Sequence, residues 1–392
     1  MTISRSIGLL LLFVTAVSAS GCAGQKATEL IATRTVAAPA PAIAGRHDIF
    51  IATTRAKAEN QAELFTRQRS PVTSYAEVEM TVPAIHKTGS IERRRASQAA
   101  DPAKVFVAEK AIGFPDEEAF VRALRPDIAA KGGRALVFIH GYNTAFDAAV
   151  YRMTQIVHDS GYTGTPILFT WASGASTVDY VYDSNSASAA RDALENTLRL
   201  VAKAGAKRID IIAHSMGNWV TVEALRQLAI SGDRDLGGRL GDVVLASPDI
   251  DVDVFKAQMT RYGKPNKPFI LFLSRDDRAL RISGFLAGNR PRLGDYGDPE
   301  DIATLGVVAV DLSNVGSGDR LNHTKFAENP VLIQVLGERL QSGDDLAPTE
   351  GQITERVNRV VAGLGGAVGG AADIVITTPL QVLNVVVSGG GR

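Results

Sequence analysis

Short apolar runs alternate with longer amphipathic segments from Arg134 onward. The runs are apolar almost throughout, without the strict alternation of a strand that has one face in water. Strands of this kind are buried on both faces, as in a parallel sheet that helices cover on both sides. The pattern therefore predicts six strands, at residues 135–140, 166–171, 209–214, 242–247, 268–274 and 306–312.

Helical spacing of apolar residues between these runs predicts the covering helices, at about 145–160, 186–204, 216–230, 253–260 and 326–341. Two earlier segments, 48–55 and 74–83, predict strands, and the alternation in the second is typical of an edge antiparallel pair. An Arg-rich stretch at 93–95 is expected to be an exposed loop. The fold class is therefore α/β, with a mostly parallel, doubly wound sheet and helices on both faces.

The first 22 residues predict a targeting segment outside the fold. Arg5 precedes an apolar run at 7–17, which small residues follow in the order of a signal peptide. Cys22 ends the sequence A-S-G-C, which resembles a bacterial lipobox, although Ala19 stands where Leu is usual. This reading predicts a secreted protein of the bacterial cell envelope, attached to a membrane through an acylated Cys22. The alternative is an ordinary signal peptide followed by an incidental cysteine.

The rest of the chain divides into three parts by composition. Residues 23–45 are rich in Ala and Pro and predict a linker, and 46–342 predict the folded domain. Residues 343–392 form an apolar, Gly- and Ala-rich C-terminal tail, in which 360–387 carry a single charge, Asp373. Glycines at small-x-x-x-small spacing allow this tail to contact a membrane, and docking on the domain is an equal alternative.

Charge and cysteine content exclude several classes of protein. Lys plus Arg equals Asp plus Glu at 42 each, so no long-range field favours nucleic acid, and no nucleic-acid partner is expected. One cysteine permits no intramolecular disulfide. No motif with the spacing of metal ligands is present, so we expect no metal and no organic cofactor.

The segment I-D-I-I-A-H-S-M-G-N carries the strongest chemical signal. An apolar strand runs directly into Ser215, and a helix is predicted to follow. Small residues at 213 and 217 allow the close approach that a nucleophile elbow needs, although Ala213 stands where Gly is usual. At the helix N-terminus the Met216 N–H is placed to donate to an oxyanion. The sequence thus predicts Ser215 as a nucleophile.

The loop after the strand at 135–140 is the candidate for a second oxyanion donor. It reads His140-Gly141-Tyr142-Asn143, and Gly141 permits a tight loop that offers the Tyr142 N–H. His140 and Asn143 are candidates for substrate contact. For Asn143 a helix N-cap is an equally good interpretation.

A serine hydroxyl needs a base, and the base needs an acid to orient it. Of the six histidines, His323 lies in a polar loop after the last predicted strand, in the chain order serine, acid, histidine. His214 adjoins the serine and is expected to point to the other side of the turn. Asp277 is the first choice for the acid, because it follows the strand at 268–274 and precedes R-A-L. Asp276 and Asp249 are the alternative acids, and an N-cap or salt bridge is a second interpretation of Asp249.

These motifs together resemble a known family. H-G-Y-N-T-A-F, F-T-W-A-S-G-A-S, Y-x-x-D-S-N-S-A, A-H-S-M-G-N, S-P-D-I-D and S-R-D-D-R-A-L are similar to a bacterial alpha/beta-hydrolase family of unknown function, over roughly residues 46–340. The resemblance implies the alpha/beta-hydrolase fold and a Ser-acid-His triad at the positions above. It implies also that Trp171, with Ser173, Tyr180 and Asp183, shapes the rim of a substrate pocket, and packing of a loop on the next helix is the alternative.

The resulting hypothesis is a serine hydrolase that cleaves an ester or a related acyl compound through an acyl-enzyme. Its partner would be a small-molecule acyl substrate. A non-catalytic envelope lipoprotein that uses the same fold for binding is the alternative function.

Overall fold

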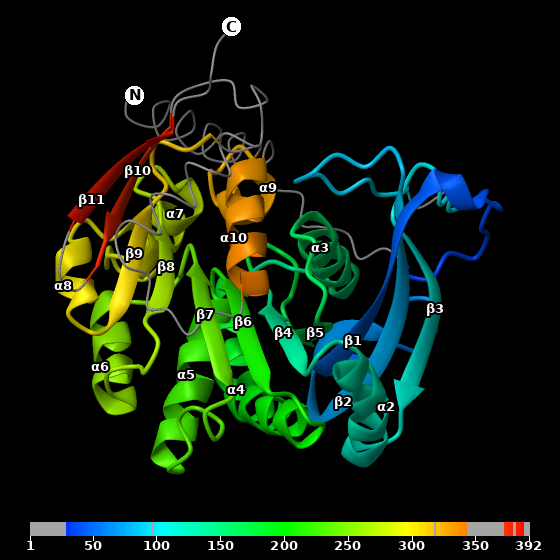
Figure 1. The fold of residues 1–392 in the computed structure, drawn as a ribbon, viewed down its shortest axis with the longest axis horizontal. Coiled ribbons are helices and arrows are strands. Elements are labelled where there is room, and N and C mark those ends of the chain that lie inside the picture. Colours follow the sequence, from blue (N-terminus) through cyan, green and yellow to red (C-terminus); the bar gives the residue numbers. More distant parts are fainter. Residues whose placement is uncertain (1–28, 96–97, 317–318, 343–371, 379–381, 388–392) are drawn as a thin grey trace, which may run out of the picture.

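The described chain builds one eleven-stranded sheet with helices on both faces (Figure 1). A computed structural model describes residues 29–95, 98–316, 319–342, 372–378 and 382–387. The strand order is β11-β10-β9-β8-β7-β6-β4-β5-β1-β2-β3. The strands are β1 (Ile43–Lys57), β2 (Phe65–Pro83), β3 (Val107–Phe114), β4 (Arg134–Ile139), β5 (Thr165–Thr170), β6 (Arg208–His214), β7 (Leu240–Ala246), β8 (Phe269–Leu273), β9 (Val307–Asp311), β10 (Ala372–Thr377) and β11 (Val382–Val387).

Parallel pairing fills the middle of the sheet and antiparallel pairing closes both ends. The strands from β9 through β6 and β4 to β1 all pair in parallel. β2 and β3 at one end, and β10 and β11 at the other, pair antiparallel. The six predicted parallel strands and the two early strands are confirmed, and the mostly parallel α/β sheet with them.

The sheet separates the core into two layers, and helices cover each of its faces. Alternate residues of β4 and β6 point to opposite faces, which explains why both strands are apolar throughout. One layer holds α2 (Glu117–Ala130), α4 (Tyr180–Lys203), α5 (Gly217–Ile230) and α6 (Val252–Tyr262), and the other holds α3 (Phe146–Asp159), α9 (Lys325–Glu328) and α10 (Pro330–Ser342) (Figure 1). The short elements are η1 (Ala40–Ala42), α7 (Arg278–Leu286), η2 (Leu293–Asp295) and α8 (Pro299–Ala303).

The strand order reverses between β4 and β6, and a crevice is expected at this point of the sheet. The chain passes from β4 to β5 on one side and returns to β6 on the other side of β4. Loops at the carboxyl ends of two such strands diverge and leave a crevice between them. Ser215 follows β6 and His140 follows β4, so the crevice lies between the two predicted site segments.

Several segments differ from the prediction. Residues 29–45 are no free linker, because Leu30 is buried and the backbone of Ile31 and Val36 bonds to the domain. The segment 93–95 is a loop, but it is not fully exposed, since Arg94 is almost buried beside Glu29. The predicted helix 326–341 is interrupted at Asn329, where Pro330 starts α10.

The predicted tail contributes two strands to the sheet. Within 343–392 the structure describes 372–378 and 382–387, and these form β10 and β11 beside β9. In the described residues no helix is both long enough and apolar enough to cross a membrane. The predicted signal segment with Cys22 lies outside the described residues.

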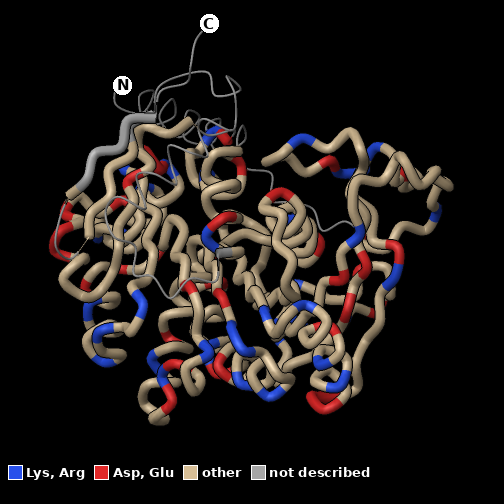
Figure 2. The backbone as a smooth tube through the Cα atoms, in the orientation of Figure 1, with Lys and Arg blue, Asp and Glu red and all other residues tan. Residues whose placement is uncertain are grey.

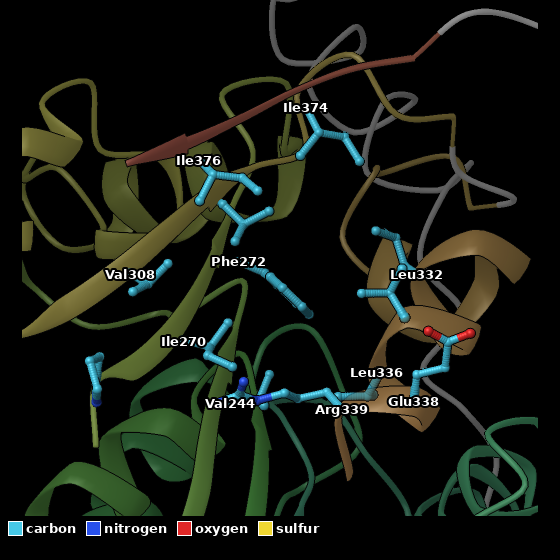
Figure 3. Close-up of a pocket in the computed structure, with 13 residues that line it drawn as sticks. Val244, Ile270, Phe272, Val308, Leu332, Leu336, Glu338, Arg339, Ile374 and Ile376 are labelled. Atoms are coloured by element: carbon cyan, nitrogen blue, oxygen red, sulfur yellow. The ribbon is translucent and has the colours of Figure 1, made fainter. Parts of the chain in front are cut away.

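An apolar cavity of about 120 Å³ lies between the sheet and α10 (Figure 3). Its walls include Phe272 and Val308 from the sheet, Ile374 from β10 and Leu332 from α10. Among the described residues, no serine, cysteine or histidine lines it. Charges of both signs are intermingled along the described chain (Figure 2), in keeping with the balanced composition.

Candidate active site

A strained turn between β6 and α5 presents Ser215. The backbone of Ser215 has φ +53°, a left-handed conformation that a non-glycine residue adopts at some cost. Asn218 fixes the turn, because its Nδ2 donates to the carbonyls of Ser215 at 2.9 Å and Ala246 at 3.0 Å. Gly217 is required for space, since a Cβ there would lie 2.3 Å from the His140 carbonyl oxygen. The turn is therefore held between the ends of β4, β6 and β7.

The loop after β4 lies directly against the serine. A Cβ on Gly141 would lie 2.7 Å from the Ser215 Cβ, so only glycine allows this approach. Tyr142 follows this contact, and Met216 follows the serine as the N-cap of α5. The amide of Met216 has no partner within the helix, because the first amides of a helix are left free by its geometry. Both predicted oxyanion donors thus come from residues next to the serine contact.

A buried arginine that the sequence analysis missed secures this loop. Arg55, on β1, is fully buried and donates to the Thr144 carbonyl at 2.7 Å, the Ser173 carbonyl at 3.3 Å and Thr170 Oγ1 at 2.9 Å. Burial lowers the pKa of Arg55 to about 10, so it stays charged at neutral pH. No motif around Arg55 in the sequence indicates this role. Arg55 comes close to the loop after β4 only because β1 pairs with β5.

His323 is joined to one carboxylate. Its Nδ1 lies 2.6 Å from Asp277 Oδ2, and Asp319 accepts from the His323 backbone N–H. Asp277 is fully buried, and it also caps α7 by accepting from the Leu280 N–H at 3.0 Å. Burial alone lowers the pKa of His323, but the neighbouring carboxylates, Asp277 foremost, raise it above the ordinary 6.5.

One cavity of about 390 Å³ brings these parts together. Ser215, His323 and Tyr142 all line it. Its walls are mainly apolar, with Ile91, Phe138, Tyr151, Leu280, Ile282, Leu286 and Leu321 among them. The described residues show no hydrogen bond between the Ser215 hydroxyl and the His323 ring, and such contacts often tighten only when substrate binds. The site thus has a serine, an imidazole paired with a carboxylate, and space for a small substrate.

Comparison with known families assigns the chain to a protein family. The family model described as "Alpha/beta hydrolase of unknown function (DUF900)" matches residues 116–339, more than half of the chain. The chain belongs to this family of alpha/beta hydrolases. A solved structure, the monoclinic form of an esterase from Pyrobaculum calidifontis, is similar with a TM-score of 0.34 and 11% identity, over 76% of this chain and 86% of that one. Among curated proteins, none matches the chain.

The other two carboxylates considered as the acid of this alpha/beta hydrolase have different partners. Asp276 pairs with the buried Lys325 at 2.7 Å. Asp249 lines the cavity, but its Oδ1 lies 2.6 Å from Arg292 Nε and also accepts from Ser283 Oγ. Of its two predicted structural roles the structure shows the salt bridge, whereas the N-cap of α6 is Asp251.

Of the predicted substrate contacts, Trp171 is corrected, and His140 has other partners as well. Trp171 is fully buried and absent from the cavity wall, because it stacks on His140 and donates through Nε1 to the His140 carbonyl at 3.0 Å. His140 borders the cavity, but its Nδ1 lies 2.8 Å from the Gly141 carbonyl and its Nε2 2.8 Å from Thr170 Oγ1. Burial, with the nearby Arg55, lowers the pKa of His140 to about 3. Trp171 therefore supports the loop from behind the cavity wall, whereas His140 stands in that wall with both ring nitrogens engaged.

Asn143 lines the cavity and is no helix cap. The N-cap of α3 is Ala145, and Asn143 instead occupies a turn with φ +54°. The buried Asp183 accepts from its N–H at 3.1 Å and from Ser173 Oγ at 2.6 Å. Asp183 and Ser173 therefore hold the loop, which is the packing alternative for this pair, while Tyr180 does line the cavity.

His214 does not point away from the site. It lines the cavity, and its ring lies 4.7 Å from that of His323. Burial lowers the pKa of His214 well below 6.5, with the neighbouring His323 adding to the effect. A neutral His214 therefore forms one wall of the His323 pocket. In the part of the chain that the structure describes, no three His, Cys, Asp or Glu side chains gather in a way that could hold a metal ion.

Proposed function

We propose that this alpha/beta hydrolase cleaves an ester or a related acyl bond through an acyl-enzyme on Ser215. The observation that carries the proposal is the cavity lined both by Ser215 on its strained turn and by His323, whose Nδ1 lies 2.6 Å from Asp277. A buried carboxylate on Nδ1 fixes the imidazole so that Nε2 can accept a proton. Because each part needs only side chains and amides, the proposal includes no metal and no organic cofactor.

The proposed reaction has two proton-balanced halves. Ser215 Oγ attacks the acyl carbon while its proton passes to His323 Nε2, and the amides of Met216 and Tyr142 donate to the oxyanion. The protonated His323 then gives this proton to the leaving alcohol, and the acyl-enzyme remains. Water attacks next, its proton passes to His323, and the acid leaves as Ser215 recovers the proton. Asp277 stabilises the imidazolium in both halves.

Covalent labelling by a fluorophosphonate tests the proposal, because the reagent reacts only with an activated serine. We expect the wild type and Ser188→Ala, which changes an exposed serine of α4, to be labelled equally. Ser215→Ala should take up no label and should hydrolyse no activated ester. If the wild type stays unlabelled while a known serine hydrolase is labelled, the proposal fails, and binding without catalysis becomes the better account. Labelling of Ser215→Ala would move the nucleophile to another serine.

We also propose that Cys22 is acylated and attaches the protein to a membrane of the bacterial cell envelope. The support is the A-S-G-C sequence after an apolar run, in a stretch outside the described residues. Cys22→Ser should move the protein from the membrane fraction to the soluble fraction, or leave it unprocessed. A correctly cleaved variant that stays in the membrane fraction would show that Cys22 is not needed for attachment.

A further inference from the structure

Exposed apolar side chains gather around the mouth of the Ser215 cavity. The described residues include thirteen large apolar side chains that are exposed, and six of them belong to three segments at this cavity. We call these six the apolar rim. They are Val178 (87% exposed), Val181 (72%), Ile282 (56%), Phe285 (71%), Leu286 (54%) and Leu321 (39%).

The cavity lining fixes the position of this rim. Ile282, Leu286 and Leu321 are exposed and also line the cavity wall. Val178 and Val181 are sequence neighbours of Thr177 and Tyr180, which also line the cavity. A folded monomer gains nothing by exposing such a cluster, and clusters of this kind mark surfaces that bind a partner.

The charged residues of α7 are of one sign. Between Asp277 and Asp295 every charged residue is an arginine. Within the described residues, the exposed guanidinium groups of Arg278, Arg281 and Arg290 form no ion pair with a carboxylate. Helix α7 thus combines exposed apolar residues with two arginines that donate to backbone carbonyls but pair with no carboxylate, which is the character of a helix that lies in the headgroup region of an anionic membrane.

We infer that the apolar rim docks on the surface of anionic lipid, so that the acyl substrate enters the cavity from the lipid phase. This inference rests on the proposed function and gives it a substrate class, an ester held in a lipid surface. Docking would cover the mouth with lipid, and an acyl chain could reach the apolar cavity wall without crossing water. A second copy of the chain fits less well, because a symmetric contact would place the arginines of α7 against one another.

Vesicle binding tests the rim without requiring catalysis. The full chain with Cys22→Ser and Ser215→Ala, which can be neither acylated nor active by the proposed route, is sedimented with vesicles of phosphatidylglycerol and phosphatidylcholine. Adding Val178→Ser and Phe285→Ser, neither of which lines the cavity, should weaken partitioning about tenfold or more. Adding Val72→Ser and Ile230→Ser instead, at exposed sites elsewhere, should leave it unchanged. Circular dichroism checks that all variants fold.

Two further measurements test the role of the arginines and the possibility of a dimer. Arg281→Gln with Arg290→Gln should weaken binding to the mixed vesicles by about tenfold and should have little effect with pure phosphatidylcholine. Equal partitioning of the rim and control variants would overturn the inference. So would a wild-type dimer in analytical ultracentrifugation that Phe285→Ser dissociates. Because sedimentation needs no reactive serine, a failure of the proposed hydrolysis would leave this result interpretable.

Hydrolysis measurements test whether the apolar rim helps the enzyme to act on esters held in lipid. With Ser215 intact, Val178→Ser with Phe285→Ser should lower the ratio of hydrolysis of a long-chain ester in vesicles to that of a short soluble ester by about tenfold. An unchanged ratio would show that the substrate does not come from lipid.

Discussion

Asp277 serves the candidate base and helix α7 at once. Its Oδ2 accepts from His323 and its Oδ1 accepts from the Leu280 N–H. Two hydrogen bonds to a fully buried carboxylate leave it one orientation, so the imidazole is fixed as well. Asp249, in contrast, is engaged by Arg292, and both side chains are almost fully buried.

Exchanging these carboxylates for amides should separate catalysis from stability. Asp277→Asn should lower kcat on an activated ester by roughly 10⁴-fold, because the histidine loses its tautomer and the imidazolium its counter-charge. Asp249→Asn should leave Arg292 buried without its counter-ion and destabilise the fold by about 3–5 kcal/mol, with a much smaller loss of kcat. Steady-state kinetics and urea unfolding measure both effects. A larger kcat loss in Asp249→Asn would assign the acid to the strand before.

The raised pKa of His323 sets the acid limb of the pH profile. The base works only when neutral, so kcat/KM should fall as pH drops through the raised pKa, with its midpoint above 6.5. In Asp277→Asn the midpoint of any residual activity should move to lower pH, because the main raising charge is gone. Rates measured between pH 5 and 9 decide this, and a wild-type midpoint below 6.5 would contradict the arrangement.

Single residues differ in how far the sequence alone could assign them. Ser215 was predictable because its strand, its turn and its helix are adjacent in the sequence. The sequence favoured Asp277 over Asp276 only by position, since side-chain direction depends on partners such as Lys325 that come from other segments. Arg55 could not be found, because it acts on a loop 85 residues farther along the chain through sheet pairing.

At the scale of elements, the approach of α5 to the end of β4 is the tightest constraint on the site. Gly217→Ala would place a methyl group 2.3 Å from the His140 carbonyl, and backbone on both sides can yield little. Overpacking of this kind typically costs about 1–3 kcal/mol, and it would also displace Ser215 from the Gly141 loop.

We therefore expect Gly217→Ala to lose most of the proposed ester hydrolysis while it remains folded with a lowered thermal midpoint. Gly113→Ala on β3 is the matched control, because a Cβ there meets nothing within 4 Å. Activity and thermal melting of the two variants are compared with those of the wild type. Full activity in Gly217→Ala would show that the turn relaxes at no cost to the site.

Helices and strands can be predicted from the sequence only where their buried residues form a recognisable apolar pattern. The central strands are apolar on both faces, and no other element gives such a run. Strand β3 leaves most of its residues partly or fully exposed, so no apolar pattern reveals it. Helix α2 contains Pro126, and α7 is short with apolar residues exposed, so both depart from the helical pattern. The sequence predicts a tail where β10 and β11 lie, because β10 becomes a strand by pairing with β9 and β11 by pairing with β10.

At the scale of the whole molecule, folding keeps most of the histidines neutral. Burial lowers the pKa of His47 to about 4 and that of His140 to about 3, and it also lowers the pKa values of His158 and His214. In an unfolded chain each of these groups would titrate near 6.5. Below that pH these four histidines therefore bind protons in the unfolded chain but remain neutral in the folded chain.

The remaining two histidines do not offset this effect. His86 lies between Glu92 and Asp159, each at 2.7 Å, and these carboxylates raise its pKa although burial opposes them. Like His323, it stabilises the fold fully below pH 6.5 and loses this contribution as the pH rises through its folded pKa. The two groups thus favour folding on the acid side of neutrality but add no further stability below 6.5.

The balance of the six histidines predicts a stability maximum near pH 6.5. As the pH falls from 6.5 toward 5, the histidines of the unfolded state bind more protons than those of the folded state, so the contribution of the histidines to the free energy of unfolding decreases. His47→Gln removes one of the groups that titrate only when unfolded, and Gln retains a polar partner for His158, which lies 3.2 Å from the His47 ring. Its thermal midpoint should therefore decline less steeply than that of the wild type over this range. Melting curves followed by circular dichroism test this, and a wild-type midpoint that is constant from pH 6.5 to 5 would show that the buried rings take up protons without cost.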